Sequence, residues 1–252
     1  MSAGSISACE CGSTAGDYKD WARIAKRPWR RLTADEVLLL VATEADARSA
    51  PVRVIEAPTE VIQGIQRSLG DLGRYATEDA VKEALNSEEC RTCREKLGQW
   101  AAGFGEVMKD PVVRINSPGL WTVTRGANGR EYIGMHVDNW YGHDMDTREA
   151  SPNRLCVNIG VESRYLLYIN VPMTAMLCVL KDNEGAPVDE RMLGTPIGLA
   201  FMEVFPDFPV IRLRVDPGEA YIAPTENMVH DGSTEGMRSW DLSASILGRF
   251  AF

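Results

Sequence analysis

The stretch Asp216-Pro-Gly-Glu-Ala-Tyr-Ile-Ala-Pro-Thr-Glu-Asn-Met-Val-His-Asp-Gly232 reads as a turn, a strand, a loop and a second strand. The Pro217-Gly218 pair favours a tight turn, because proline presets one backbone angle and glycine tolerates the next. The apolar residues that follow predict short strands at 219–223 and 226–230. The second strand ends on His230. Short strands bounded by turn residues are typical of antiparallel sheet proteins.

The same pattern of short strands bounded by turn residues extends over the C-terminal half of the chain. Further strands are predicted at 112–116, 119–125, 131–137, 154–161, 163–171, 209–215 and 238–247. Gly126-Ala-Asn-Gly129 predicts a hairpin before the third of these. Residues 172–208 interrupt the series and read as an insertion that contains a helix at 195–205. The strands suffice for an eight-stranded jelly roll of two packed sheets, with one extra strand.

The sequence pattern of the N-terminal half predicts helices. Thr33 and Glu36 match a capping box ahead of an apolar run, and further helices are predicted at 57–72, 77–85 and 87–108. Residues 1–16 lack periodicity and predict a flexible leader. The expected fold is mainly β with N-terminal helices: a double-stranded β-helix, or cupin-like jelly roll, braced by helices. We expect one catalytic domain over 17–252, with 17–110 as helical support and 112–252 as the core.

Composition narrows the possible partners. The chain of 252 residues has a formal net charge of −9, which disfavours nucleic acid and favours a small-molecule substrate. It has neither an apolar stretch long enough to span a bilayer nor the pattern of a secretion signal, so we predict a cytoplasmic protein without membrane contact. The oligomeric state is not predicted.

His136-Val137-Asp138 is the most informative motif for chemistry. Side chains two apart on a strand share a face, so His136 and Asp138 can bind one metal ion. The chain has three histidines, at 136, 143 and 230, and His143 lacks an acid two residues on. His230 is therefore the expected third ligand. Two imidazoles and one carboxylate form a facial triad, which leaves positions of a non-haem Fe(II) open.

The order His136-x-Asp138, His230 and then Arg238 resembles the Fe(II)/2-oxoglutarate-dependent oxygenase superfamily. The likeness is to its small bacterial hydroxylases of amino-acid and natural-product metabolism, and it covers about residues 112–250. It implies that His136, Asp138 and His230 bind iron and that Arg238 binds the distal carboxylate of 2-oxoglutarate, with Arg249 as a second candidate. A planar guanidinium suits that role because it donates two parallel hydrogen bonds.

The resemblance implies a dioxygenase that uses Fe(II), 2-oxoglutarate and O₂ to hydroxylate an unactivated C–H bond. The expected substrate is an amino acid or a natural-product intermediate. Related halogenases have a small residue in place of the acid, so Asp138 favours hydroxylation. Desaturation, epimerisation and cyclisation use the same ligands and stay open. A cupin-like metal enzyme or binding module that does not use 2-oxoglutarate is the alternative.

The loop after the motif is the expected place for substrate contacts. Trp140 and Tyr141 are expected to cover the site, and Asp144 and Asp146 to meet an amino or guanidino group, unless they only solvate the loop. Arg164, on a predicted strand, is a candidate for a substrate or co-substrate carboxylate, with a surface ion pair as the alternative.

The six cysteines allow one further hypothesis. Cys9, Cys11, Cys90 and Cys93 could form a four-thiolate zinc site. The alternative is that Cys90 and Cys93 are chance neighbours on a helix. Cys156 and Cys178 lie in apolar segments and are expected to be small buried hydrophobes.

Overall fold

The computed structural model describes residues 6–9, 11–13, 18–26, 28–40, 52–183 and 194–251. In these residues two five-stranded antiparallel sheets form the centre of the protein. The first sheet has the order β12 (Met228–Ser233), β9 (Arg164–Pro172), β10 (Val210–Val215), β1 (Ile6–Cys9) and β4 (Arg30–Arg31). The second has the order β5 (Arg53–Glu56), β11 (Glu219–Ala223), β8 (Asn153–Asn158), β13 (Asp241–Phe250) and β6 (Gly105–Asn116).

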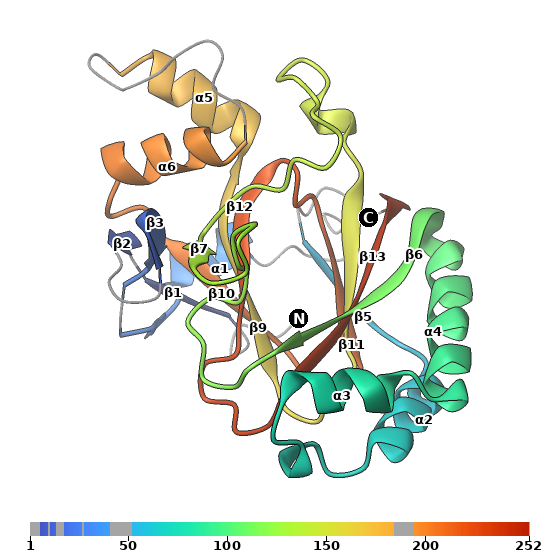
Figure 1. Cartoon of the computed structure of the whole chain (residues 1–252). Helices are drawn as coiled ribbons and strands as arrows, with labels where there is room; N and C mark the ends of the chain where they lie inside the picture. Colours follow the sequence, from blue (N-terminus) through green and yellow to red (C-terminus); the bar gives the residue numbers. More distant parts are fainter. Residues whose placement is uncertain are drawn as a thin grey trace.

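The two sheets pack face to face (Figure 1). Buried side chains of β9 and β10, among them Leu166 and Leu213, contact side chains of β8 and β11, among them Cys156 and Tyr221. A layer of this kind excludes water from the space between the sheets. Near one end of that space the apolar filling gives way to polar and charged side chains, which form the site described below.

Helices α2 (Thr59–Leu69), α3 (Glu78–Leu85) and α4 (Glu88–Ala101) cover the outer face of the second sheet. Leu242, Ala244 and Ile246 of β13 point outward into this helical layer. Successive side chains of a strand alternate between its two faces, so Ser243 and Ser245 point the other way, into the space between the sheets.

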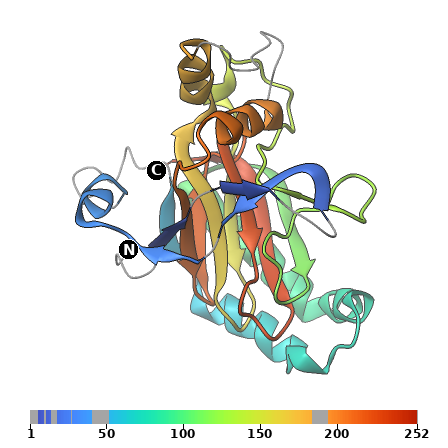
Figure 2. The ribbon, with the colours of Figure 1, turned by 90° about the vertical axis from the view of Figure 1, so that its left-hand side faces the viewer.

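The first sheet has its own cover. Helices α5 (Met173–Lys181) and α6 (Thr195–Val204) pack with β9 and β12 residues in a second apolar cluster. A three-stranded sheet of β2 (Cys11–Ser13), β3 (Tyr18–Ala25) and β7 (Tyr132–Gly134) lies beside this cluster, and its β3–β7 ladder is the parallel one. Figure 2 shows α5 and α6 at one end of the sheets and α2 and α3 at the other.

Most predicted elements are present. The capping box is confirmed at the start of α1 (Ala34–Leu40), where the Glu36 amide donates to Thr33 Oγ1 at 3.2 Å and the Thr33 amide to Glu36 at 2.8 Å. The predicted hairpin is also confirmed, since the Gly126 amide donates to the Glu131 carbonyl oxygen at 2.8 Å. The insertion contains α6 as expected.

Several boundaries are corrected. The helix expected over 87–108 ends at Ala101, and after a 3₁₀ turn at Ala102–Phe104 the chain enters β6 at Gly105. Residues 119–125 form an extended loop rather than a strand, although the Val123 amide still donates to the Gly232 carbonyl oxygen at 3.1 Å.

The N-terminal expectations need two further corrections. Residues 6–9 and 11–13 of the expected flexible leader form β1 and β2, and the rest of 1–16 lies outside the described residues. Pairing with β10 gives β1 its order through backbone hydrogen bonds, which composition does not reveal. The expected helical support also contains β3, β4, β5 and the start of β6, so the protein is mixed α and β rather than mainly β.

Within the described parts of the chain, no helix combines the length and the apolar character needed to cross a membrane.

Candidate metal centre

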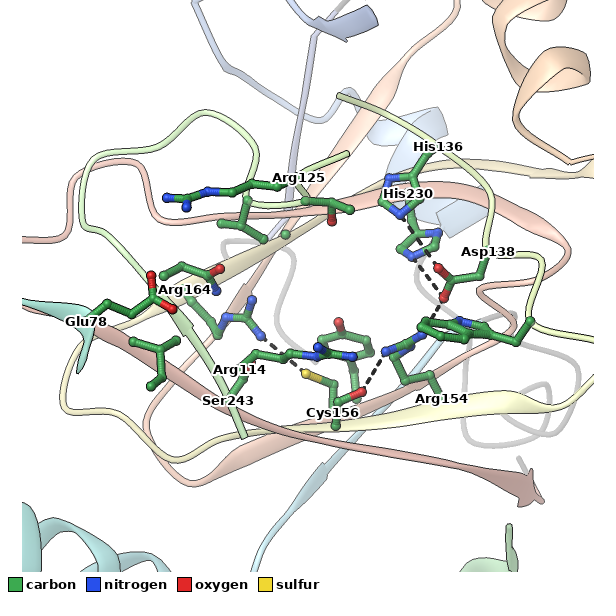
Figure 3. Close-up of a pocket in the computed structure, with 18 residues that line it drawn as sticks. Glu78, Arg114, Arg125, His136, Asp138, Arg154, Cys156, Arg164, His230 and Ser243 are labelled. Atoms are coloured by element: carbon green, nitrogen blue, oxygen red, sulfur yellow. Dashed lines mark hydrogen bonds and ion pairs between the residues drawn. The ribbon is translucent and has the colours of Figure 1, made fainter. Parts of the chain in front are cut away.

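His136, Asp138 and His230 come together at one end of the space between the sheets (Figure 3). One ligand atom from each lies within 4.8 Å of the others, and among the described residues this is the one group of three or more metal-ligating side chains. The backbone explains the convergence. His136 and His230 are antiparallel bridge partners, joined by amide-to-carbonyl hydrogen bonds of 3.0 and 2.8 Å.

Both imidazoles present the same nitrogen to the centre. Nδ1 of His136 lies 3.0 Å from the Gly134 carbonyl oxygen, and Nδ1 of His230 lies 3.0 Å from the Met228 carbonyl oxygen. A carbonyl oxygen can only accept, so each Nδ1 carries the proton and each Nε2 keeps its lone pair. These Nε2 atoms lie 3.7 and 3.8 Å from the Asp138 carboxylate. Such backbone contacts orient metal-ligating histidines.

The charge states of His230 and Asp138 fit a metal ligand set. Burial lowers the pKa of His230 to about 4, so this imidazole is neutral near pH 7. Burial acts to raise the pKa of Asp138, but its contact with His136 and the positive charge of Arg154 outweigh burial and hold the pKa well below its ordinary value. A neutral imidazole and an ionised carboxylate are the forms that bind a divalent ion.

Arg154, which the sequence analysis did not single out, is the closest partner of Asp138. It lies on β8 and donates from one terminal nitrogen to Asp138 Oδ2 at 2.6 Å and from the other to Ser245 Oγ at 2.7 Å. The pair leaves Oδ1 of the carboxylate facing His136. Arg154 therefore fixes the orientation of the acid.

A second acid lies behind His136. Asp231 is fully buried, and its Oδ1 accepts hydrogen bonds from Thr124 Oγ1 at 2.9 Å and from the Gly232 amide at 2.6 Å. Its Oδ2 lies 3.7 Å from His136 Nδ1 and has no hydrogen-bond partner among the described residues. Burial raises the pKa of Asp231. A carboxyl oxygen beside Nδ1 favours the tautomer that leaves Nε2 free for a ligand.

Two glycines shape the site. Gly134 has φ +66°, and a Cβ there would lie 2.3 Å from the Arg23 carbonyl oxygen, so the turn into the His136 motif requires glycine. Gly232, two residues after His230, leaves room for Arg164, because a Cβ would lie 2.8 Å from its guanidinium.

The triad opens into a pocket of about 410 Å³. Its wall includes side chains of β6, β8, β9, β11, β12 and β13, so both sheets contribute to it. A pocket of this volume can hold a small molecule. Besides the triad, the polar side chains of the wall that could bind a ligand include Arg114, Arg125, Arg154, Arg164, Tyr221, Ser243 and Ser245.

Arg164 is buried in this pocket, away from the triad (Figure 3). Its Nε lies 3.0 Å from Asp241 Oδ1, and a terminal nitrogen lies 3.3 Å from Cys156 Sγ. Burial alone would lower the pKa of Arg164, but the charge of Asp241 outweighs it and the pKa is raised. The expected alternative of a surface ion pair is wrong, because the pair is internal.

Arg238 does not reach the pocket. It precedes β13, its side chain is exposed, and its backbone amide donates to Glu162 at 3.1 Å. Apolar and polar side chains do alternate along the strand that follows, β13. Its apolar face packs on the helices, however, and its serine face lines the pocket. Arg238 is therefore not placed to bind the carboxylate of a co-substrate in the pocket. Arg249 is also exposed and donates to the Ala150 carbonyl oxygen at 2.7 Å.

The loop after the motif divides into pocket and surface residues. Trp140 lines the pocket, whereas Tyr141 is exposed outside its wall. Asp144 accepts hydrogen bonds from the Thr147 amide and hydroxyl at 3.0 and 2.7 Å, and Asp146 is exposed. Neither acid lines the pocket, so a contact of Asp144 or Asp146 with a substrate amine there is not supported.

The cysteines occupy separate places. Cys90 and Cys93 are buried in the helical cluster on the second sheet, and the side chains of Cys9 and Cys11 lie outside the described residues. Cys156 is buried as expected and lines the pocket, but Cys178 is exposed on α5.

No known protein-family model matches the chain, and a search of curated proteins also gives no match.

Arg114, Arg154 and Tyr221 are among the pocket residues that sequence reasoning missed. Arg154 and Cys156 are two apart on a predicted strand and so share a face, which was a usable signal. Arg114 gave none, because nothing in the sequence tells which face of 112–116 points inward.

Proposed function

We propose that the protein is a non-haem Fe(II)/2-oxoglutarate-dependent oxygenase that hydroxylates an unactivated C–H bond of a small molecule. The observation that carries the proposal is the convergence of two Nε2 atoms and one carboxylate within 4.8 Å, in the wall of a pocket between the two sheets. This donor set suits Fe(II) and leaves coordination positions for other ligands.

The order of the strands supports a double-stranded β-helix. Along the chain, β6, β8, β11 and β13 lie in the second sheet, while β9, β10 and β12 lie in the first. The segment around His136 pairs with β12 and so extends the first sheet. Alternation of this kind between two facing sheets is the pattern of a jelly roll.

Arg164 is the residue best placed to bind the distal carboxylate of 2-oxoglutarate. It is buried in the same pocket as the triad, whereas Arg238 and Arg249 lie outside the pocket wall. An arginine inside a protein needs an anion, and Asp241 neutralises it in the absence of a ligand. Tyr221 and Ser243 line the same part of the pocket and can donate hydroxyl hydrogen bonds.

In the reaction, iron and 2-oxoglutarate supply the oxidising chemistry, with one atom of O₂ entering the substrate and the other entering succinate as CO₂ is released. The protein holds the metal, orients Asp138 through Arg154, binds the co-substrate and keeps bulk water away from the reacting carbon. Desaturation, epimerisation and cyclisation would use the same site and differ in the product.

The test is conversion of 2-oxoglutarate to succinate by the purified protein with Fe(II) and ascorbate. We expect succinate to form only when Fe(II) and O₂ are both present, and its formation to stop in His136→Ala. A metal-dependent oxidation without 2-oxoglutarate would support the cupin-like enzyme instead. Metal-free ligand binding alone would support the binding module.

A further inference from the structure

A second cavity of about 160 Å³ adjoins the pocket. The two share Arg114, Trp140, Arg154 and Ser245 in their walls, so they lie side by side. We call the second one the side cavity. The rest of its wall consists of Lys109, Asp110, Val112 and Leu247.

Basic side chains outnumber acidic ones around the two cavities, although the chain has 36 acidic and 27 basic residues. The basic members of the two walls are Lys109, Arg114, Arg125, Arg154 and Arg164, and the acidic ones are Glu78, Asp110 and Asp138. Local excess of positive charge in an acidic protein indicates that these cavities receive an anion.

Most of these charges already have partners. Arg154 pairs with Asp138 and Arg164 with Asp241, at 2.6 and 3.0 Å. Glu78 pairs with Lys82 on its own helix at 2.8 Å. The Arg125 guanidinium stacks 5.4 Å from the Tyr132 ring.

Arg114 has no such partner in the described part of the chain. Among the described residues, no side chain or backbone atom lies within ion-pair or hydrogen-bond distance of its guanidinium, although this group lines both cavities. Figure 3 shows it directed into the pocket, between Arg164 and Arg154. The position is fixed by β6, where Arg114 is the cross-strand partner of Ser243.

Trp140 lines both cavities, as Arg114 does, and gives their walls a flat aromatic surface. Its indole lies 5.4 Å from Lys109 Nζ and 5.7 Å from the Arg154 guanidinium, and half of its surface remains exposed, at 52%. The open part of the ring can stack on a planar or apolar portion of a ligand. A cationic ligand would be repelled by Lys109, Arg114 and Arg154 together.

We propose that the side cavity is the substrate subsite and that the substrate is an anion whose carboxylate or phosphate group is bound by Arg114, with its body against Trp140. The proposal rests on the proposed function, because an anion bound in this cavity is a substrate only if the protein is an oxygenase. It replaces the expected amine contacts of Asp144 and Asp146, which lie outside both walls. Arg164 remains for the co-substrate, so the two anions bind in neighbouring cavities.

The test measures ligand binding by the metal-free full-length protein, and so does not depend on oxygenase activity. Benzoate, phenyl phosphate and the uncharged benzamide are titrated by calorimetry. The variants are Arg114→Gln, Arg114→Lys and, as a matched control, Arg53→Gln, an exposed arginine of β5 outside both cavity walls. Thermal unfolding checks that each variant is folded.

We expect at least one anion to bind ten times more tightly than benzamide in the wild type and in Arg53→Gln. Arg114→Gln should remove that preference, and Arg114→Lys should keep part of it, because the charge stays while the planar donor pair is lost. Preference for benzoate over phenyl phosphate identifies a carboxylate substrate, and the reverse identifies a phosphate ester.

Equal binding of benzoate and benzamide, no binding of either anion at millimolar concentration, or an Arg114→Gln variant equal to the wild type would overturn the subsite. Anion binding that depends on Arg114, in a protein that never forms succinate, would leave the anion site standing and remove the oxygenase proposal.

Discussion

At His136 and His230 the tautomer of each imidazole is fixed by a backbone carbonyl oxygen, at 3.0 Å in both cases. The sequence could predict these two residues and Asp138, because histidines are scarce and the motif has strand spacing. It could not predict Arg154 as the partner of Asp138, since that contact joins β8 to a loop through tertiary packing.

The first prediction concerns the metal. His230→Ala removes one of three ligands, so we expect affinity for Mn(II), used as a redox-stable substitute for Fe(II), to fall by a factor of at least about 100. The measurement is a titration followed by electron paramagnetic resonance of free Mn(II). His143→Ala is the control, because His143 lies outside the pocket wall and near Thr147. Equal loss in both variants would argue against the triad.

At the scale of elements, β13 explains why Arg238 does not reach the pocket in which the sequence predicts it to bind 2-oxoglutarate. The sequence predicted the alternation over 238–247 correctly but not which face would meet the helices, because an apolar face can pack on either layer. The strand begins at Asp241, after a turn that Glu162 holds by accepting hydrogen bonds from the Arg238 and Ser239 amides at 3.1 and 2.7 Å.

The second prediction follows from this turn. Burial acts to raise the pKa of Glu162, but the hydrogen bonds from Ser239 and Arg238 outweigh it and lower the pKa below its ordinary value. A carboxyl with a lowered pKa stabilises the fold above its ordinary pKa and loses that contribution as pH falls. We therefore expect the melting temperature of the wild type to fall more than that of Glu162→Gln between pH 6 and pH 3. Identical pH profiles would contradict this role.

The third prediction concerns the loop that carries Trp140. Arg148 is fully buried, lies 3.6 Å from the buried Glu226 and donates to Asn139 Oδ1 at 3.1 Å. Arg148→Met leaves the Glu226 carboxylate without a cation, which costs on the order of 3–5 kcal/mol when a buried pair is broken. Urea unfolding measures the change.

Arg130→Met is the matched control for Arg148, because Arg130 is exposed in the hairpin. We expect it to change the free energy of unfolding by less than about 0.5 kcal/mol, as surface substitutions usually do. A loss of similar size in both variants would show that the Arg148–Glu226 pair does not stabilise the loop.

At the scale of the whole molecule, the site joins the two sheets. His136 and His230 come from the first sheet's side, while Arg154 of β8 and Ser245 of β13 come from the second. The sequence predicted most helices, most strands and the insertion from periodicity and turn residues, but it did not predict α5. It did not predict that β1 would complete the first sheet, because that pairing joins residues about 200 apart through backbone groups.

The fourth prediction follows from this arrangement. A metal that binds only the folded state stabilises it by about 2.7 kcal/mol at a concentration of 100 times its Kd. For a chain of this size that corresponds to a rise in melting temperature of about 5–10 °C. We expect this rise with Mn(II) in the wild type and its absence in Asp138→Ala, measured by differential scanning fluorimetry. A rise of equal size in both would place the metal elsewhere.

The most direct test of the proposed function is an anaerobic titration of the metal-free protein with Fe(II) and 2-oxoglutarate, followed by the visible charge-transfer band of the chelate. We expect the band in the wild type and its loss in His230→Ala. Arg164→Met should need at least about ten times more 2-oxoglutarate, and Arg238→Met should match the wild type. Absence of the band in the wild type would contradict the assignment as a 2-oxoglutarate-dependent oxygenase.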